Sequence, residues 1–419
     1  MFYVDGTPRR KYIAFASYAM ENAMKPPNLV IIGASAAGLA AAQEVRKQAP
    51  DASITLISEE AYLPYHRPSL TELIGDDSVE QRPTFFLQKE SWFLEQNITL
   101  LRGVRATKID CAAQTVTLAS GALVPFDRLL LAVGSTPFVP IAGALNWERV
   151  FAVRTLDDAR RVARCAAQCR ETVIIGGGLL GLEAANALLK RGHRVQVIEL
   201  ADRMLPMQLD PEGSRFFQRI VEKAGVVVHL SAQTDRLLGE GTARGIVLKS
   251  GQEIAADMVL FSVGVRANTD LAREAGIAVN RGIIVNARME SSVPGIYAAG
   301  DCAEFGRLPQ LWMPAVKEGT VAGRNAAGGT AEFVPESYPA VLKVFGTQIY
   351  SAGDVGRDPQ ATYEVMRDYS EEEAFYRALF FRDGNLTGAI LIGDITLAGS
   401  LTKAVAIGIE RAAAEAMIR

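Results

Sequence analysis

The sequence is constrained most by a pattern that occurs twice: a buried strand, a glycine-rich turn, a helix and a second strand. Residues 29–60 carry the first copy and residues 172–200 the second. Each copy is typical of the βαβ unit of a dinucleotide-binding domain. After each copy a hairpin with a Ser-Gly turn leads, at the same spacing, to a closing glycine, Gly134 or Gly264. A single glycine-rich turn is a weak signal, but two copies with the same continuation predict two related domains.

The order of the motifs predicts how the domains follow one another. The second domain is expected to be inserted into the first, to which the chain then returns. Near the C-terminus several strands follow one another, and the Asp383-Gly384 pair predicts a tight turn between the last two. We therefore predict an α/β fold with two Rossmann-like domains. The expected boundaries are 1–24 for an N-terminal extension, 25–136 and 265–334 for the first domain, 137–264 for the inserted domain, and 335–419 for a small C-terminal α+β domain.

The first glycine-rich turn runs from Gly33 to Gly38. Gly33 allows the tight turn from strand to helix, and Gly38 lets the helix pack closely on the strand. The middle position holds Ser35, which is small and whose hydroxyl can itself bond a phosphate. The start of the helix, including Ala36 and Ala37, offers N–H groups and a partial positive charge to an anion. These residues are candidates for binding a dinucleotide pyrophosphate.

The acid that is expected to bond a ribose hydroxyl is displaced in the first half. The second strand ends at Ser58 and is followed by Glu59 and Glu60. Either carboxylate can reach the ribose, and we favour Glu60. The alternative, in which both are solvated loop acids, stays open.

The second turn is a complete fingerprint. Glu199 closes the following strand, where a carboxylate bonds the adenosine ribose 2′-hydroxyl and repels a 2′-phosphate. This predicts NADH rather than NADPH, although Arg203 lies close enough in sequence to soften the preference. The candidate cofactor residues of the turn itself are Gly176, Gly178, Leu180 and Gly181.

Composition excludes several classes of function. The chain has 44 Lys and Arg against 47 Asp and Glu, a formal net charge of −3, so no basic excess is available for nucleic-acid phosphates. Four cysteines are too few for a disulfide-stapled scaffold. Neither they nor the three histidines have the spacing of a metal site, so none is predicted. The chemistry is therefore assigned to a bound organic cofactor.

No apolar run is long enough for a membrane-spanning helix, so no membrane association is predicted and we expect a cytoplasmic protein. Residues 1–24 are ambiguous. Arg9, Arg10 and Lys11 precede a short apolar run, which loosely imitates a signal peptide. A natural start at Met24 is favoured because a strand begins immediately after it, and the role of the extension stays open.

Together these motifs resemble those of the two-dinucleotide-domain FAD/NAD(P)-dependent oxidoreductases, from Met24 onward. GASAAG resembles the FAD pyrophosphate loop and GGGLLGLEAA the NAD loop. The first domain would thus bind FAD and the inserted domain NAD(H). GIYAAGDCAEF, at residues 295–305, is similar to the second FAD motif, whose aspartate binds the ribitol chain. The resemblance assigns further cofactor contacts to Gly300 and Asp301, Arg67 in PYHRP, Arg154 in VRTLDDA, Ala106 near the adenine, and the closing glycines Gly134 and Gly264.

Among subfamilies, the sequence most resembles NADH:rubredoxin reductases and the flavin modules of nitrite reductases, with ferredoxin reductases next. The last group usually reads RPPLSK where this chain has residues 67–72, and its lysine lies near the flavin and can pair with a glutamate. That glutamate is present as Glu183, but Glu72 stands in the lysine position. If Glu72 and Glu183 both lie near the flavin, their mutual repulsion would raise the pKa of one of them. Alternatively, Lys317 or Lys343 lies between the two carboxylates.

The positions without cysteine distinguish this chain within the family. Disulfide reductases carry a cysteine pair on the helix after the FAD loop, and peroxidase or coenzyme-A-disulfide relatives carry one near residues 62–75. Both regions lack cysteine here. Because a thiol–disulfide relay needs a thiolate, the resemblance implies that electrons leave the flavin directly.

Three residues are candidates for a catalytic role. Glu183 is expected near the contact between nicotinamide and flavin, although a first-turn acid favoured by the helix dipole is an equal alternative. Trp312 aligns with an aromatic residue beside the flavin and would line the electron exit, unless it is a packed interface residue. Lys317 lies on a helix whose N-terminus should point at the flavin pyrimidine, where both features stabilise an anionic reduced flavin.

The expected function is that of an FAD-dependent NADH oxidoreductase that passes electrons between NAD(H) and a one-electron acceptor. Rubredoxin, a ferredoxin or iron–sulfur subunits are the expected partners, and a hetero-oligomer and a homodimer both fit. One alternative is the NAD-coupling flavin subunit of a larger iron–sulfur complex, of the nitrite reductase or the 2-oxoacid (phenylglyoxylate) oxidoreductase type. Another is a non-turnover flavoprotein that senses NADH. The acceptor, the direction of electron flow and the oligomeric state stay open.

Overall fold

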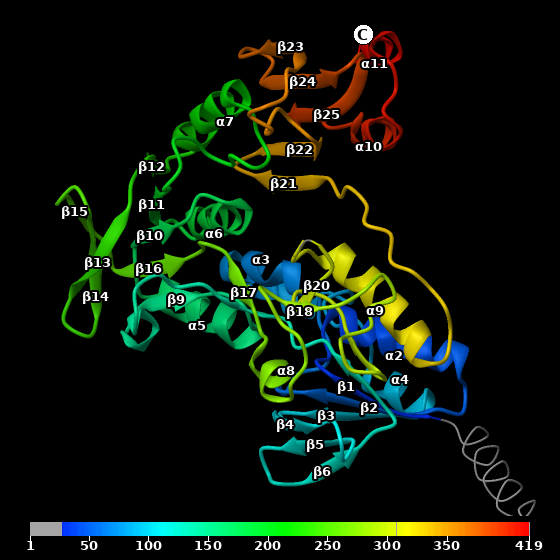
Figure 1. Ribbon diagram of the computed structural model, residues 1–419. Coiled ribbons are helices and arrows are strands. Elements are labelled where there is room, and N and C mark those ends of the chain that lie inside the picture. The colour runs from blue at the N-terminus through cyan, green and yellow to red at the C-terminus, as the bar shows by residue number, and fades with distance from the viewer. Residues whose placement is uncertain (1–26, 307, 419) are drawn as a thin grey trace, which may run out of the picture. The chain divides into compact units, whose positions relative to one another are not determined.

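The computed structural model describes residues 27–306 and 308–418, and the chain divides into two compact units. Each unit is assembled from segments that are far apart in the sequence, as the colours of Figure 1 make visible. The expected N-terminal extension, residues 1–24, lies outside the described residues. The first unit takes in the chain up to Tyr65, Phe86–Ser135 and Ala267–Val334, and the second takes in His66–Phe85, Thr136–Arg266 and Pro335–Arg419.

The first unit is built on a five-stranded parallel sheet with the order β19-β7-β1-β2-β3. The central strands are short and nearly all apolar, as expected where helices cover both faces of a parallel sheet. β19 follows the inserted segment in the sequence, so this sheet is complete only after the chain returns. Its main elements are β1 (Asn28–Ile32), β2 (Ser53–Ser58), β3 (Ile98–Arg102), β7 (Arg128–Leu131), β19 (Ile296–Ala298), α2 (Ala36–Gln48) and α9 (Trp312–Ala326).

The second unit repeats this plan with a parallel sheet of order β12-β11-β10-β16-β9. β10, β11, β12 and β16 occupy the places of β1, β2, β3 and β7. The fifth strand differs in origin, since β9 precedes the glycine-rich turn in sequence. The elements are β9 (Val150–Ala152), β10 (Glu171–Ile175), β11 (Arg194–Ile198), β12 (Val227–His229), β16 (Met258–Phe261), α5 (Leu156–Ala166), α6 (Leu179–Lys190) and α7 (Pro211–Lys223).

A small antiparallel sheet accompanies each parallel one, β4-β5-β6 in the first unit and β13-β14-β15 in the second. The prediction of two related Rossmann-like domains is therefore confirmed. These strands are β4 (Ala106–Asp110), β5 (Thr115–Leu118), β6 (Leu123–Pro125), β13 (Thr234–Gly239), β14 (Ala243–Leu248) and β15 (Glu253–Ala255). The remaining short elements are β8 (Ser135–Pro137), β17 (Val265–Ala267), β18 (Ile283–Ile284), β20 (Ala303–Glu304), α3 (Leu70–Gly75), α4 (Glu90–Glu95), α8 (Asp270–Glu274) and the 3₁₀ turns η1 (Arg67–Ser69), η2 (Asp77–Gln81) and η3 (Ala144–Asn146).

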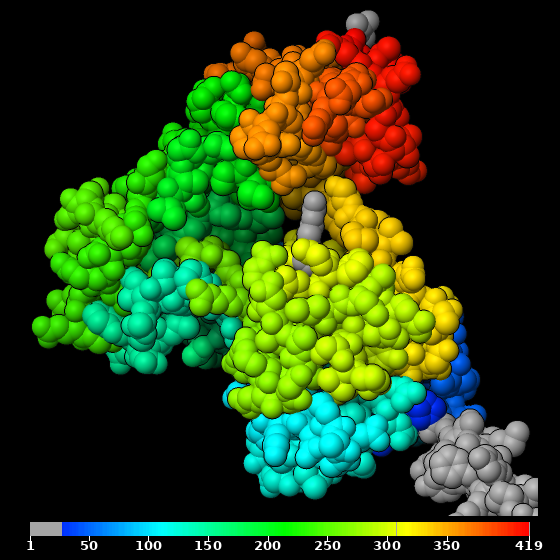
Figure 2. Space-filling view, viewed as in Figure 1, coloured from blue at the N-terminus to red at the C-terminus, as the bar shows by residue number. Residues whose placement is uncertain are grey.

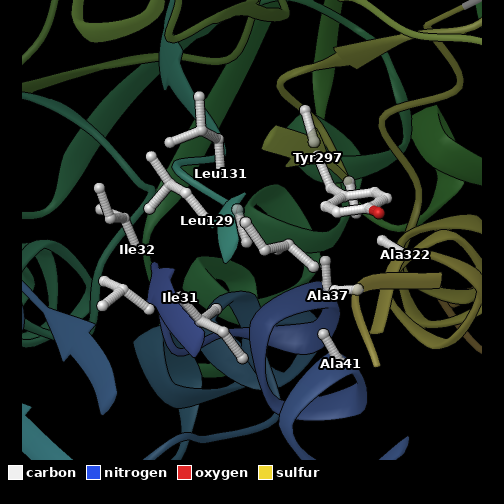
Figure 3. Close-up of a cluster of buried hydrophobic side chains, with 14 of the residues drawn as sticks. Ile31, Ile32, Ala37, Ala41, Leu129, Leu131, Tyr297 and Ala322 are labelled. Carbon is white, nitrogen blue, oxygen red and sulfur yellow. The ribbon is translucent and has the colours of Figure 1, made fainter. Parts of the chain in front are cut away.

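Helices α2 and α9 pack against each other through small residues in the core of the first unit. A Cβ on Gly319 would overlap the backbone of Ala37, and one on Gly323 would overlap the backbone of Ala41. Figure 3 shows both alanines on α2 beside the buried side chains of the central strands, with Ala322 on α9. This close approach holds the middle and C-terminal half of α9 against the first two turns of α2.

The C-terminal part of the second unit is an antiparallel sheet of order β21-β22-β25-β24-β23 with two helices, which confirms the predicted α+β class. Asp383 and Gly384 both adopt positive φ and join β24 to β25 in the predicted tight turn. The elements are β21 (Ala340–Val344), β22 (Thr347–Gly353), β23 (Glu364–Ser370), β24 (Phe375–Arg382), β25 (Asn385–Ile392), α10 (Ala398–Ile407) and α11 (Arg411–Ile418).

A buried polar cluster joins this C-terminal sheet to α7, and Figure 2 shows the two surfaces in contact. Asp210, at the N-cap of α7, accepts hydrogen bonds from Arg367 at 2.9 Å and from the Tyr376 hydroxyl at 2.8 Å. Because the carboxylate is buried, each partner compensates part of its desolvation. Among the described residues, no helix is long and apolar enough to span a membrane.

Candidate cofactor sites

The first glycine-rich turn has a geometry that only glycine permits at its two ends. Gly33 has φ +107°, and a Cβ there would overlap the carbonyl oxygen of Ala132. A Cβ on Gly38 would overlap the carbonyl oxygen of Gly33. Ser35 is the N-cap residue of α2, so the free N–H groups of the helix start with Ala36. This strand–turn–helix arrangement is the one that binds a dinucleotide pyrophosphate.

The turn at Gly300 and Asp301 lies against this first turn of α2. A Cβ added to Gly300 would be 3.0 Å from the Cβ of Ala37, so a side chain there would crowd the helix. Asp301 accepts a hydrogen bond of 2.8 Å from the buried hydroxyl of Ser135 in β8. The structure thus brings two motifs that are more than 250 residues apart in sequence, around Ser35 and Asp301, to one place in the first unit.

A buried acid supports the same turn and is not among the residues that the sequence motifs single out. Glu318, in the second turn of α9, is 3% exposed and accepts a hydrogen bond of 2.8 Å from the N–H of Gly300. Burial raises the pKa of Glu318 to about 7, with the nearby charge of Asp301 acting in the same direction and the Gly300 N–H opposing it. The only sequence signal is an acid on an otherwise apolar helix face.

The acids that follow β2 have distinct surroundings. Ser58 is buried and its hydroxyl donates to the carbonyl oxygen of Glu60 at 3.0 Å. The Tyr65 hydroxyl donates to the Glu60 carboxylate at 2.6 Å, whereas Glu59 is exposed and lies 3.6 Å from Arg105. Glu60 is therefore the acid whose side chain is fixed. The sequence motifs do not single out Tyr65 as its partner.

The remaining candidates of the first unit occupy separate elements. Gly134 follows β7 and its carbonyl accepts from the N–H of Asn268 at 3.0 Å, and Ala106 begins β4. Trp312 is the first residue of α9 and is partly buried against the core. Lys317 lies in the second turn of the same helix and is partly exposed. The helix that carries both residues is the one that packs against α2 through Gly319 and Gly323.

The second glycine-rich turn reproduces the first with one added bond. Gly176 has φ +111°, and a Cβ there would overlap the carbonyl oxygen of Ser262, while a Cβ on Gly181 would overlap that of Gly176. At Gly178 no atom of the described chain lies within 4 Å of the place a Cβ would take, so the backbone can be approached by a ligand. The N–H of Gly177 donates to Glu199 at 2.7 Å, which closes the turn.

Glu199 is held by the main chain on both sides. One carboxylate oxygen accepts from Gly177 and the other from the N–H of Ala201 at 2.7 Å. A carboxylate oxygen has two lone pairs, so each can still accept a bond from a ribose hydroxyl. From the sequence, Arg203 is expected to soften a preference for NADH over NADPH. Its guanidinium pairs with the carboxylate of Asp202 at 3.0 Å.

Glu183 accepts a hydrogen bond from a hydroxyl of the same unit. The Thr71 hydroxyl donates to its carboxylate at 2.8 Å, across the contact between α3 and α6. The pKa of Glu183 is raised, mainly by burial and to a lesser extent by the charge of Glu72, while the bond from Thr71 opposes the shift. Glu72, in the position of the family's lysine, forms an ion pair with Arg82 at 2.5 Å.

The other candidates in the second unit lie at its edges and loops. The guanidinium of Arg67 donates to the carbonyl oxygen of Arg154, and the N–H of Arg154 donates to Asp158 at 3.1 Å. Leu180, in the first turn of α6, is 53% exposed, which is unusual for a large apolar side chain beside a cofactor turn. The carbonyl oxygen of Gly264 accepts from the N–H of Phe138 at 2.9 Å.

Both turns therefore fit a dinucleotide. Burial raises the pKa of Cys165 and of Cys302 to about 12, so neither thiol ionises near neutral pH. Among the described residues there is no group of three or more His, Cys, Asp or Glu side chains that could hold a metal ion.

Comparisons with known proteins agree with this geometry. Residues 27–319 match the family described as pyridine nucleotide-disulphide oxidoreductase, and residues 339–409 match the C-terminal domain of rubredoxin NAD+ reductase. The chain is 32% identical over 387 residues to an NADH-rubredoxin oxidoreductase of Clostridium acetobutylicum, covering 91% of this chain and 95% of the relative. It is 35% identical over 376 residues to a nitrite reductase [NAD(P)H] of Bacillus subtilis, covering 88% of this chain and 46% of the relative.

A solved structure of an NAD-dependent persulfide reductase from A. fulgidus has a TM-score of 0.84 at 28% identity, covering 91% of this chain and 77% of that one. The chain spans about half the length of the nitrite reductases that it matches. These findings confirm the resemblance seen in the sequence, including the rubredoxin reductase type, and FAD and NAD(H) are the cofactors of the family. The chain is an oxidoreductase, and it belongs to the pyridine nucleotide-disulphide oxidoreductase family.

Proposed function

We propose that this chain is an FAD-dependent NADH oxidoreductase that exchanges electrons with a one-electron iron–sulfur or rubredoxin-type protein. The observation that carries the proposal is the presence of two dinucleotide turns in a chain in which burial raises the pKa of the Cys165 and Cys302 thiols to about 12. The similarity of residues 339–409 to the C-terminal domain of rubredoxin NAD+ reductase favours a rubredoxin-type acceptor. The same two turns serve for electron flow in either direction.

NADH is the preferred nicotinamide nucleotide in this proposal. Glu199 is rigid, because two backbone N–H groups hold its carboxylate. A fixed negative charge beside the ribose accepts a bond from the 2′-hydroxyl and repels a 2′-phosphate. The pairing of Arg203 with Asp202 leaves the guanidinium partly neutralised, so it offers less to a phosphate.

FAD, when bound, supplies the capacity to take two electrons from a nicotinamide and release them one at a time. The residues that would hold it are those of the Gly33–Gly38 turn, Asp301 and Glu60 in the first unit. Arg67 and Arg154, from the second unit, are proposed as further contacts on the strength of the family motifs. Ala106 is proposed beside the adenine, and Gly134 and Gly264 beside the cofactors.

The proposed roles of the three catalytic candidates are positional and electrostatic. Glu183, fixed by Thr71, would hold or release a proton at its carboxylate close to the nicotinamide. Lys317 would stabilise negative charge on the reduced cofactor. Trp312, partly buried at the start of α9, would lie on the path of electron exit.

Direct electron exit, with no thiol relay, is part of the proposal. Cys302 follows Asp301 in the sequence, yet it is fully buried and its thiol donates to the carbonyl oxygens of Leu131 and Ala299. The sulfur of Cys165 lies 3.5 Å from that of Cys169, and burial raises the pKa of the Cys165 thiol to about 12. A nucleophilic relay requires a thiolate, which these surroundings disfavour.

A second candidate function is that of the NAD-coupling flavin subunit of a larger iron–sulfur complex. The specific observation in its favour is that the chain spans only about half of the nitrite reductases it matches. A third candidate function is that of a flavoprotein that binds NADH as a sensor and does not catalyse its turnover.

The test is to mix the purified protein with NADH under anaerobic conditions while recording the flavin spectrum. Fast loss of the oxidised flavin absorbance, with rapid turnover of rubredoxin or a one-electron dye, supports the reductase. A long-lived charge-transfer band with negligible turnover would favour the sensor. Isolation from the native host in a stable assembly with iron–sulfur proteins would favour the subunit, and a lone monomer or homodimer would count against it.

A further inference from the structure

We propose that Glu318 is a positioning residue for the flavin nucleotide: its buried carboxylate fixes the N–H of Gly300 and thereby the turn that presents Asp301. The proposal rests on the proposed function only in that FAD is the group bound by the first unit. Neither the glycine-rich motifs nor the cysteine pattern singles out this residue.

Main-chain bonds hold the turn on both sides of Gly300, and the N–H of Gly300 itself is held by Glu318. The N–H of Ala299 donates to Leu131 in β7 at 3.0 Å, and the N–H of Ala303 closes the turn on the carbonyl oxygen of Gly300 at 2.8 Å. Between them, the N–H of Gly300 is buried and points at α9, where the Glu318 carboxylate accepts it. Because a buried backbone N–H must be paired, removing this acceptor would leave an orphaned donor or move the turn.

Movement of this turn would be transmitted to both halves of the cofactor site. Gly300 lies against Ala37 in the first turn of α2, where the pyrophosphate is expected. Asp301 is the next residue, and its carboxylate is tied to Ser135 at 2.8 Å. The position of Glu318 is itself fixed, since the adjacent Gly319 packs without a side chain on the backbone of Ala37.

The chemistry of the carboxyl group is consistent with a role as hydrogen-bond acceptor and not as a fixed charge. Burial raises the pKa of Glu318 to about 7, so the neutral and ionised forms are both populated near neutral pH. In each form at least one oxygen can accept the N–H of Gly300. A glutamine offers the same carbonyl oxygen at the same reach, so it should replace the glutamate.

The experiment compares FAD release from the purified holoproteins of wild type, Glu318→Gln and Glu318→Ala, measured as the rise of flavin fluorescence on dilution. We expect Glu318→Ala to weaken FAD binding by about tenfold or more, and Glu318→Gln to stay within about threefold of wild type. Asn325→Ala is the matched control: Asn325 is buried on the same helix and bonds the carbonyl oxygens of Arg288 and Ala331, away from the turn. This control should lose thermal stability but keep its FAD affinity.

Wild-type affinity in Glu318→Ala, or equal loss in Glu318→Gln and Glu318→Ala, would overturn the proposal. If Glu318→Ala does not fold, the comparison of Glu318→Gln with Ser135→Ala decides. We then expect Ser135→Ala, which removes one hydrogen bond from Asp301, to weaken FAD binding while Glu318→Gln does not, and the reverse order would overturn the proposal. A wild-type protein that binds no FAD would instead refute the proposed function itself.

Discussion

The two dinucleotide turns share one backbone plan but differ in where the acid is placed. In the second unit Glu199 directly follows β11 and accepts a hydrogen bond from the N–H of Gly177 in the turn. In the first unit the equivalent strand ends in Ser58, and the fixed acid, Glu60, lies two residues later and is held by Tyr65. The difference teaches that the two units share the strand–turn–helix geometry but not the position of the fixed acid, and we propose that this position determines how each unit binds the adenosine ribose.

The largest expected effect comes from side chains added to the second turn. Gly176→Ala should destabilise the second unit by about 3 kcal/mol or more, because it combines an unfavourable φ with an overlap at Ser262. Gly178→Ala, which has ordinary φ and open space around it, should change stability by less than about 0.5 kcal/mol yet weaken NADH binding. Thermal unfolding and NADH titration separate the two effects. Equal stability of the two variants would contradict the packing account of this turn.

The next effect tests the carboxylate of Glu199, which two backbone N–H groups hold. Glu199→Gln keeps an acceptor for Gly177 but removes the negative charge, so the ratio of kcat/KM for NADH to that for NADPH should fall by about tenfold. Glu60→Gln, in the first unit, should leave this ratio unchanged. The measurement is steady-state turnover with each nucleotide and a one-electron dye. Unchanged discrimination in Glu199→Gln would remove this residue from the role.

A smaller effect is expected in the first unit. Tyr65→Phe removes the hydroxyl that holds Glu60, a loss of about 1 kcal/mol for one hydrogen bond to a charged group. FAD affinity should therefore fall by about fivefold, measured by flavin release, with the NADH-to-NADPH ratio unaffected. If FAD affinity does not change, Glu60 does not act through this contact.

The smallest effect concerns proton binding at Glu183. Burial raises the pKa of this carboxyl group, so the folded chain binds the proton more tightly than the unfolded chain, and stability falls as pH rises through the folded pKa. Thr71→Val removes a hydrogen bond that favours the ionised form and should raise the pKa further, whereas Thr71→Ser should not. The limb of the pH–rate profile assigned to Glu183 should move to higher pH by a fraction of a unit. A shift to lower pH would show that Thr71 does not stabilise the carboxylate.

Much of the fold could be predicted from the sequence because it depends on patterns among residues that are close in sequence. The repeated strand–turn–helix unit and the Asp383-Gly384 turn each depend on residues that are close in sequence. The structure confirms both, together with the antiparallel C-terminal sheet. The positive φ of Gly33 and of Gly176 is a local requirement, whereas their overlaps with Ala132 and Ser262 depend on strands that are distant in sequence.

The partners of the acids could not be predicted in the same way. Thr71 and Glu183 are 112 residues apart, and their contact exists only because α3 packs on α6. Glu318 accepts a bond from a main-chain N–H, and because every residue except proline has this group, the residue type of the partner does not reveal the contact. The motifs do not single out Thr71 as the partner of Glu183, nor Arg82 as the partner of Glu72. Tertiary packing decides such pairs.

The central claim, that electrons leave the flavin without a thiol relay, is tested most directly by a variant that lacks all four cysteines. Cys111, Cys165, Cys169 and Cys302 are replaced by alanine, and NADH-driven reduction of rubredoxin is measured per bound FAD. The account predicts turnover within about threefold of wild type, because none of these thiols takes part in electron transfer. A loss of more than about a hundredfold, in a variant that still binds FAD and is still reduced by NADH, would contradict it.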